Sequence, residues 1–182
     1  MTTSIAPPRR WTYADYCRIP ADGKRHEIID GRHFVNPAPS PYHQTVSRRL
    51  QYELMRLVEK PGLGEVFNAP IDVHIGRGTL VQPDLLVLRP ATRRIVGPKK
   101  LTGVPDLVIE ILSPSTRQND RRLKKARYER AGVREYWLVD PNAETIEQFV
   151  LRGKRYTAPA LHTDSITLRI LRGITIDLHE VW

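Results

Sequence analysis

The stretch Asp106–Leu112 reads DLVIEIL, a run of branched apolar residues interrupted by one acidic residue, Glu110. Such a run is typical of a central β-strand that is covered on both faces. The proline in Ser113–Ser115 ends the strand because proline has no N–H to donate to a sheet. Alternation along the strand places Glu110 on the same face as Asp106 and Val108. An unpaired buried carboxylate costs several kcal/mol, so Glu110 requires a partner: an arginine in an ion pair, a proton or a bound cation.

The segment that follows predicts a helix and a second buried strand. Asn119 or Asp120 is expected to cap a helix that runs to about Ala131, and Gly132 is a suitable C-terminal stop. The next apolar run, EYWLV at Glu135–Val139, is predicted to be a strand. Because a helix separates two apolar strands, the whole segment predicts a crossover unit with parallel strands.

Two patterns near the start of the chain are equally clear. Asp30-Gly31 lies between short apolar runs within Arg25–Asn36, which predicts a β-hairpin. Glu27 then lies on the first strand of this hairpin. Over Pro41–Lys60, apolar residues recur at spacings of three and four, which predicts a helix with one apolar face.

Asp84 is the second acidic residue in an unusual place, since it stands between Pro83 and the apolar strand candidate Leu85–Leu88. An aspartate after proline is commonly a turn residue. Two carboxylates on neighbouring strands, followed by a lysine-bearing helix, instead indicate a shared site. The remaining patterns are weaker and comprise a strand at Ala69–Ile75, a loop over Arg89–Val104, a hairpin around Arg152–Lys154 and an unassigned apolar tail, Ile166–Leu178.

The chain is strongly basic. It has 29 Lys and Arg residues against 20 Asp and Glu residues, which gives a formal net charge of +9. This field attracts polyanions such as nucleic acid, although a basic protein without a polyanionic partner is the alternative. No run approaches the roughly 18 apolar residues that span a bilayer. The single cysteine, Cys17, has no partner for a disulfide, so a soluble protein of the reducing cytoplasm is expected, with no membrane association.

Motifs spread over most of the chain resemble those of a known family. They are PDLLVL at Pro83–Leu88, PDLVIEILSPST at Pro105–Thr116, the spaced set Asp120, Lys124, Tyr128 and Gly132-Val133, EYWLVDP at Glu135–Pro141, RHEIIDG at Arg25–Gly31 and PYHQ at Pro41–Gln44. Together they resemble the Uma-type restriction endonucleases, a branch of the PD-(D/E)XK nuclease superfamily. The resemblance implies an α/β, restriction-endonuclease-like fold, in which α-helices flank a mixed central β-sheet and a β-hairpin lies near the N-terminus.

The resemblance also implies a site. Asp84 and Glu110 are expected to bind a metal ion, and Glu27 is either a third ligand or an ordinary residue of an edge strand. In the superfamily the lysine follows the second acid by two positions, but Leu112 stands there. Lys124 matches a lysine moved to the following helix, so Asp84, Glu110 and Lys124 are the expected catalytic residues. Oxygen ligands partly open to water favour Mg²⁺ or Mn²⁺.

Other residues are expected around this site. His43 either approaches it from the first long helix or serves as a capping or surface residue. Tyr128 lies one helical turn after Lys124, so its ring either holds the lysine or packs in the core. The residues expected to bind the nucleic acid backbone are Arg117, Arg121, Arg122 and Lys125.

The expected function is that of a divalent-metal-dependent endonuclease that hydrolyses phosphodiester bonds, of DNA rather than RNA, by metal-activated water. Lys124 would orient or deprotonate this water, or neutralise the transition state. Two alternatives are a catalytically inactive nucleic-acid-binding protein on a nuclease fold and a dimeric scaffold in which Asp84 and Glu110 form ion pairs. We expect a flexible tail over residues 1–10, a single nuclease-like domain over residues 11–182, and a homodimer, because a concerted double-strand cut needs two sites.

Overall fold

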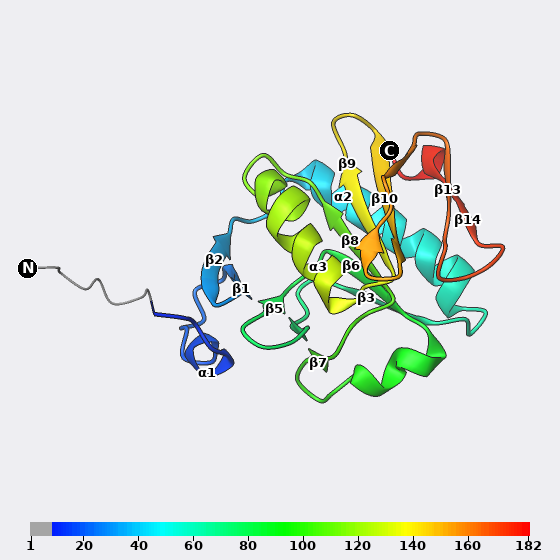
Figure 1. The fold of residues 1–182 in the computed structure, drawn as a ribbon. Helices are drawn as coiled ribbons and strands as arrows, with labels where there is room; N and C mark the ends of the chain where they lie inside the picture. Colours follow the sequence, from blue (N-terminus) through cyan, green and yellow to red (C-terminus); the bar gives the residue numbers. More distant parts are fainter. Residues whose placement is uncertain (1–8) are drawn as a thin grey trace, which may run out of the picture.

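The centre of the molecule is a mixed β-sheet. The structure is a computed structural model that describes residues 9–182, so residues 1–8 of the expected flexible tail lie outside the described part. The sheet has seven strands in the order β11-β10-β9-β8-β6-β3, with β12 paired to β10 (Figure 1). Its strands are β3 (Glu65–Asn68), β6 (Leu85–Leu88), β8 (Leu107–Ile111), β9 (Glu135–Asp140), β10 (Thr145–Arg152), β11 (Arg155–Tyr156) and β12 (Ala160–His162).

The predicted crossover unit forms the middle of this sheet. β8 runs antiparallel to β6 and parallel to β9, which confirms the expected mixed sheet and the parallel pair. The connection contains a helical segment, η3 (Asn119–Lys124) followed by α3 (Lys125–Ala131). Gly132 ends it in a left-handed conformation with a φ of 93°, as predicted.

The predicted cap of this helix was wrong. Neither Asn119 nor Asp120 caps the helix, because the turn begins earlier: the Ser113 hydroxyl accepts a hydrogen bond from the N–H of Thr116 at 3.3 Å, and the Ser113 carbonyl accepts one from the N–H of Arg117 at 2.9 Å. Asp120 is consequently inside the helix, where its side chain is buried with 2 % exposure. This placement frees its carboxylate for another role.

The two faces of the sheet are covered by different elements. On one face, α2 (Pro41–Leu54) and its continuation η1 (Met55–Glu59) bury Val46, Leu50, Leu54 and Val58, as the apolar spacing predicts. The unassigned tail covers the same face through a hairpin and a short turn: β13 (Ser165–Thr167), β14 (Thr175–Asp177) and η4 (Leu178–Glu180). On the other face lies α3, so α2 and α3 sandwich the sheet (Figure 1).

A smaller five-stranded sheet, in the order β2-β1-β5-β4-β7, also lies against the α3 face. Its strands are β1 (Arg25–Ile29), β2 (Arg32–Asn36), β4 (Val73–His74), β5 (Leu80–Val81) and β7 (Leu101–Thr102). β1 and β2 are the predicted hairpin, in which Asp30 and Gly31 adopt positive φ angles of 51° and 78°. Because this hairpin adjoins the crossover unit, Glu27 on β1 faces the residues of β8.

Two expectations in the connecting regions need correction. The strand expected at Ala69–Ile75 is only Val73–His74, since Pro70 has no N–H for a sheet, and the strand β3 at Glu65–Asn68 was not predicted. The expected loop after β6 contains the helical turn η2 (Pro90–Ile95) and β7. A short helix, α1 (Tyr13–Tyr16), precedes β1. Among residues 9–182, no helix combines the length and the apolar character needed to cross a membrane.

Candidate active site

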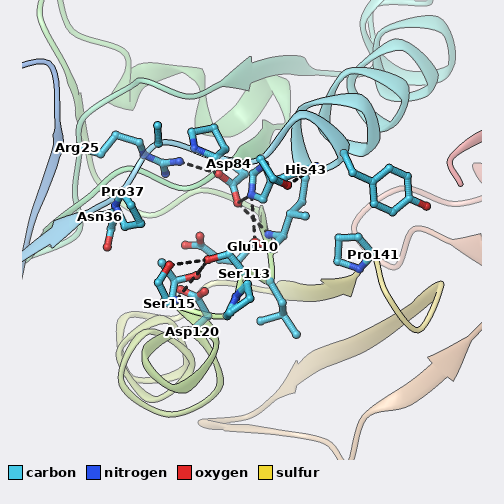
Figure 2. Close-up of a pocket in the computed structure, with 18 of the residues that line it drawn as sticks. Arg25, Asn36, Pro37, His43, Asp84, Glu110, Ser113, Ser115, Asp120 and Pro141 are labelled. Atoms are coloured by element: carbon cyan, nitrogen blue, oxygen red, sulfur yellow. Dashed lines mark hydrogen bonds and ion pairs between the residues drawn. The ribbon is translucent and has the colours of Figure 1, made fainter.

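The register between β6 and β8 brings the two predicted acidic residues together. Leu85 lies opposite Ile109, so one step further places Asp84 opposite Glu110. The Oδ2 atom of Asp84 accepts a hydrogen bond from the backbone N–H of Ile111 at 2.8 Å, which fixes the aspartate at the end of β8. Figure 2 shows both carboxylates on the wall of one pocket, between α2 and the helix that carries Asp120.

Lys124 is buried in the midst of three carboxylates. Its Nζ atom lies 3.1 Å from both oxygens of Glu110 and 3.0 Å from Oε1 of Glu27. It also lies 3.4 Å from Oδ1 of Asp120, one helical turn earlier. The side chain of Lys124 is only 3 % exposed, so this contact is not a surface ion pair. The structure thus assembles all three residues that were expected to be catalytic, Asp84 among them.

Leu112 stands at the position where the superfamily has its lysine. Leu112 is buried in the core cluster on the α3 face, and its N–H bonds to the carbonyl of Val139. It lies two residues after Glu110 and therefore on the same side of the strand. Lys124 reaches that side from the helix above and contacts Glu110 directly.

Tyr128 and His43 surround the acidic pair. The ring of Tyr128 packs in the core, which was one of its two expected roles, and its hydroxyl donates to Oε1 of Glu110 at 2.7 Å. The Nε2 atom of His43, in the first turn of α2, lies 3.1 Å from the carbonyl oxygen of Ile111 and 3.3 Å from Oδ2 of Asp84. A carbonyl can only accept, so Nε2 carries the proton. His43 therefore links α2 to the acidic pair.

Glu27 is fixed in place by hydrogen bonds from neighbouring residues. Its Oε1 accepts the backbone N–H of Gln82 at 2.7 Å in addition to Lys124, and its Oε2 accepts the Nδ2 amide of Asn36 at 2.7 Å. Both oxygens are thus occupied by protein donors. Because Glu27 is not among the residues that line the pocket, it supports Lys124 from the β1 side.

Two residues of the site were missed in the sequence. Arg25 donates from Nη1 to Oδ1 of Asp84 at 2.9 Å. Its position two residues before Glu27 on a strand was the available signal, because such residues share a face. Asp120 contacts Lys124, and its spacing of four residues from that lysine on a helix was the signal. Its oxygen Oδ1 is buried and accepts no hydrogen bond from the described residues.

The pocket has a volume of about 250 Å³, and it is lined by Asp84, Glu110, Asp120 and Lys124 at its base. Burial opposes the charge on Asp84, but the hydrogen bond with His43 and the nearby Arg25 guanidinium hold its pKa at about 2. Glu110 behaves in the opposite way. Burial raises the pKa of Glu110 well above its ordinary value, and Lys124 only partly offsets this. Asp84 is therefore fully ionised, whereas Glu110 resists ionisation.

The carboxylates around Lys124 outweigh the effect of burial on its pKa. Burial acts to lower the pKa of this amine, but the attraction of Glu110, Glu27 and Asp120 is stronger and raises it well above its ordinary value. The amine consequently stays protonated at neutral pH. Such a lysine can orient a water molecule and neutralise negative charge, and it does not accept a proton.

The charges and donor atoms of this site fit a divalent cation. When all four carboxylates are ionised, they face two permanent cations, Arg25 and Lys124, which leaves an excess of two negative charges. Carboxylate oxygens are the hard donors that Mg²⁺ and Mn²⁺ prefer, and the Oδ1 atom of Asp120 has unused acceptor capacity. Within residues 9–182, no three acidic, histidine or cysteine side chains already stand at metal-binding spacing. The ammonium of Lys124 occupies the space between the carboxylates instead.

The expected nucleic-acid-binding residues lie outside this pocket. Arg117 pairs with Asp140, and Arg121 pairs with Glu147 at 2.6 Å. The Nζ atom of Lys125 stands over the ring of Phe149, 4.3 Å from its centroid, and Arg122 is exposed. Their contact with nucleic acid remains a prediction, and three of the four already have partners within the protein.

Comparisons with known proteins identify the fold and the family. A crystal structure described as "a putative nuclease belonging to DUF820 from Anabaena variabilis ATCC 29413" has a similar fold, with a TM-score of 0.78 and 16 % identity, over 93 % of this chain and 96 % of that chain. A search of curated proteins found no match. The model of the Uma2 family, described as "Putative restriction endonuclease", matches residues 13–179. Since this match spans nearly the whole chain, the protein belongs to the Uma2 family of restriction-endonuclease-like proteins.

Proposed function

We propose that this protein is a divalent-metal-dependent nuclease that hydrolyses phosphodiester bonds of DNA. The observation that carries the proposal is the buried lysine surrounded by carboxylates at the base of a pocket: Lys124 with Glu110, Asp120 and Glu27. Buried carboxylates in excess of their cations are costly in a purely structural role. Membership of a restriction-endonuclease-like family gives the same reaction class.

Asp84, Glu110 and Asp120 would hold the cation, because they are the acidic residues that line the pocket. A divalent cation bound there would lower the pKa of water and stabilise negative charge on the phosphate. Glu27 takes a supporting part in this proposal, since both of its oxygens already accept hydrogen bonds from the protein.

Lys124 contributes a positive charge next to the reacting phosphate. A water oxygen attacks phosphorus and the bond from phosphorus to one nucleoside oxygen breaks. The leaving oxygen ends with a proton that derives from the water, so the products are a phosphate monoester and a free hydroxyl group. Because its pKa is raised, Lys124 acts as an ammonium that orients the water and neutralises the phosphate oxygens in the transition state. His43 and Arg25 hold Asp84 in place from either side.

The test is cleavage of plasmid and oligonucleotide DNA in Mg²⁺ or Mn²⁺, with EDTA as the metal-free condition. Lys124→Ala should lower the rate by about 100-fold or more, which is the usual cost of removing one preorganised charge from a transition state. Lys60→Ala is the control, because this exposed lysine follows η1, at the other end of the α2 helix from the pocket residue His43. It should keep the rate of the unmodified protein to within about twofold.

Circular dichroism and urea denaturation must show that the Lys124→Ala protein is folded before its rate is interpreted. DNA binding that persists in EDTA, with no cleavage in either metal, would favour an inactive binding protein. Equal loss of activity in the Lys124 and Lys60 variants would contradict the proposed role of the buried lysine.

A further inference from the structure

The acidic residues at the base of the pocket are nearly closed off from solvent. Asp84 is 5 % exposed, and Glu110 and Asp120 are each 2 % exposed. In the proposed nuclease function, on which this inference rests, the scissile phosphate must reach them. Base stacking and pairing keep the phosphates of a duplex on a wide cylindrical surface, whereas an unpaired strand can bend into a pocket. The depth of the site thus bears on the form of its substrate.

The size of the pocket also favours an unpaired strand. Its volume of about 250 Å³ falls just below the range of roughly 300 to 1,000 Å³ that is common for small-molecule sites. A pocket of this size has room for about one nucleotide unit. Figure 2 shows Pro37 and Pro141 on either side of the acidic residues, so the walls come from separate parts of the chain.

The walls above the acidic base are uncharged. They contain apolar side chains such as Pro37, Leu112 and Pro141, the aromatic ring of Tyr42, and small polar groups such as those of Ser113 and Asn142. The two cations in the pocket, Arg25 and Lys124, both pair with its carboxylates. Duplex DNA is bound mainly through phosphate contacts with basic side chains, so this lining suits a base and a sugar better than a double-helical backbone.

Tyr42 is the aromatic residue of these walls. It is the second residue of α2, two positions after the Ser40 cap, and it is 40 % exposed although it lines the pocket. Unpaired bases are bound by stacking on such exposed aromatic rings, whatever their sequence. A base that stacks on Tyr42 would leave its phosphate near the acidic base of the same pocket.

We infer that the pocket accepts one nucleotide of an unpaired DNA strand, with Tyr42 as the stacking surface for its base. The substrate is then single-stranded DNA, or a single-stranded tail or gap within a duplex. The binding strength depends on the aromatic ring of Tyr42, and the surface basic residues add attraction without choosing between the two forms of DNA.

The experiment measures binding and cleavage separately. Binding of one fluorescent oligonucleotide, free and as its perfect duplex, is followed by fluorescence anisotropy with Ca²⁺ in place of Mg²⁺, and a gel confirms that the DNA stays intact. Cleavage of both forms is then measured in Mg²⁺. We expect at least a tenfold preference for the single strand in both assays. Tyr42→Ala should weaken single-strand binding roughly 5- to 100-fold, while Tyr42→Trp should retain it.

Tyr52→Ala is the matched control, because Tyr52 lies on the same helix, is 58 % exposed and does not line the pocket. It should leave binding unchanged. Equal binding of the single strand and the duplex, or equal effects of the Tyr42 and Tyr52 substitutions, would overturn the inference. Cleavage of duplex and single strand at the same rate would also overturn it and leave the proposed nuclease function standing. Selective single-strand binding that depends on Tyr42, without cleavage in Mg²⁺ or Mn²⁺, would support the inference and contradict the nuclease.

Discussion

Two glutamates on neighbouring strands of the central sheet are equally buried but have different surroundings. Glu135 begins β9 and is fully buried. Its Oε1 accepts hydrogen bonds from the indole of Trp137 at 2.7 Å and the amide of Gln148 at 2.6 Å, and its Oε2 accepts the backbone N–H groups of Arg169 at 2.7 Å and Ile170 at 2.9 Å. These four uncharged donors replace the water that the carboxylate loses on burial.

Glu110, near the end of β8, has the opposite environment. It receives bonds from Tyr128 and Lys124, but Asp84, Asp120 and Glu27 lie close enough to raise its pKa further. The local charge balance is therefore unfavourable without another cation. Glu110 also lines a pocket, whereas Glu135 does not line that pocket and joins the C-terminal segment to the sheet.

The comparison separates two uses of a buried acid. A carboxylate whose acceptors are filled by neutral donors stabilises the fold, and its removal should affect stability. A carboxylate crowded by other carboxylates stores an unfavourable interaction that a substrate or a cation can relieve. Substitutions at the two glutamates should therefore act on different measured quantities.

The largest expected effect is on catalysis at Glu110. In the proposed nuclease, Glu110→Gln should lower the single-turnover rate of DNA cleavage in Mg²⁺ by about 100- to 1,000-fold, because it removes one charge that would bind the cation. Urea denaturation without metal should show a free energy of unfolding within about 1 kcal/mol of the unmodified protein, since the substitution also relieves repulsion among the carboxylates. A folded variant with full activity would contradict the catalytic role of Glu110.

Glu135→Gln should show the reverse pattern. Its amide nitrogen would face N–H donors where an oxygen now accepts, so the free energy of unfolding should fall by about 3 kcal/mol in urea denaturation. The rate of DNA cleavage per folded molecule, measured at low temperature, should stay within about twofold. A large loss of activity in a protein that is still folded would mean that Glu135 also acts at the active site.

The local parts of this fold could be predicted because local chemistry determines them. Asp30-Gly31 specifies a tight hairpin, the spacing of apolar residues specifies α2, and Gly132 specifies the end of α3. The resemblance to a family placed Asp84, Glu110 and Lys124 in one site, and the structure brings their side chains together. Patterns of this kind depend on residues that are neighbours in sequence or lie on adjacent strands.

The rest depended on contacts between distant segments. Asp120 had the residue type of a helix cap, and its spacing from Lys124 became informative once the earlier turn at Ser113 placed Asp120 inside the helix. Alternation along β1 places Arg25 on the same face as Glu27, but only the fold shows that Asp84, 59 positions away, is its partner. Glu135 looks in the sequence like the polar start of an apolar strand, because its donors come largely from the C-terminal segment and β10. Side-chain environments of this kind require the tertiary fold.

Asp84 extends the comparison to the pH dependence of the free energy of unfolding. Its pKa of about 2 lies below its ordinary value of 3.8, so it stabilises the folded state above pH 4 and loses this contribution as the pH falls from about 4 to 2. Asp84→Asn should therefore lower the free energy of unfolding by about 2 kcal/mol at pH 7 and by much less near pH 2. Urea denaturation across this range measures the difference, and Asp164→Asn, at an exposed aspartate, is the control. A difference that does not change with pH would contradict the assignment.

The smallest expected effect tests whether Asp120 faces the cation. Asp120→Asn should weaken Mg²⁺ or Ca²⁺ binding about tenfold in isothermal titration calorimetry, which is the scale of losing one supporting or direct ligand. Asp106→Asn is a matched control, because Asp106 is equally buried but pairs with Arg89 away from the pocket. It should lower stability and leave metal affinity unchanged. If Asp120→Asn binds the metal normally, the carboxylate serves only to hold Lys124, and the excess negative charge at Glu110 must be relieved by substrate binding rather than by a third acidic ligand.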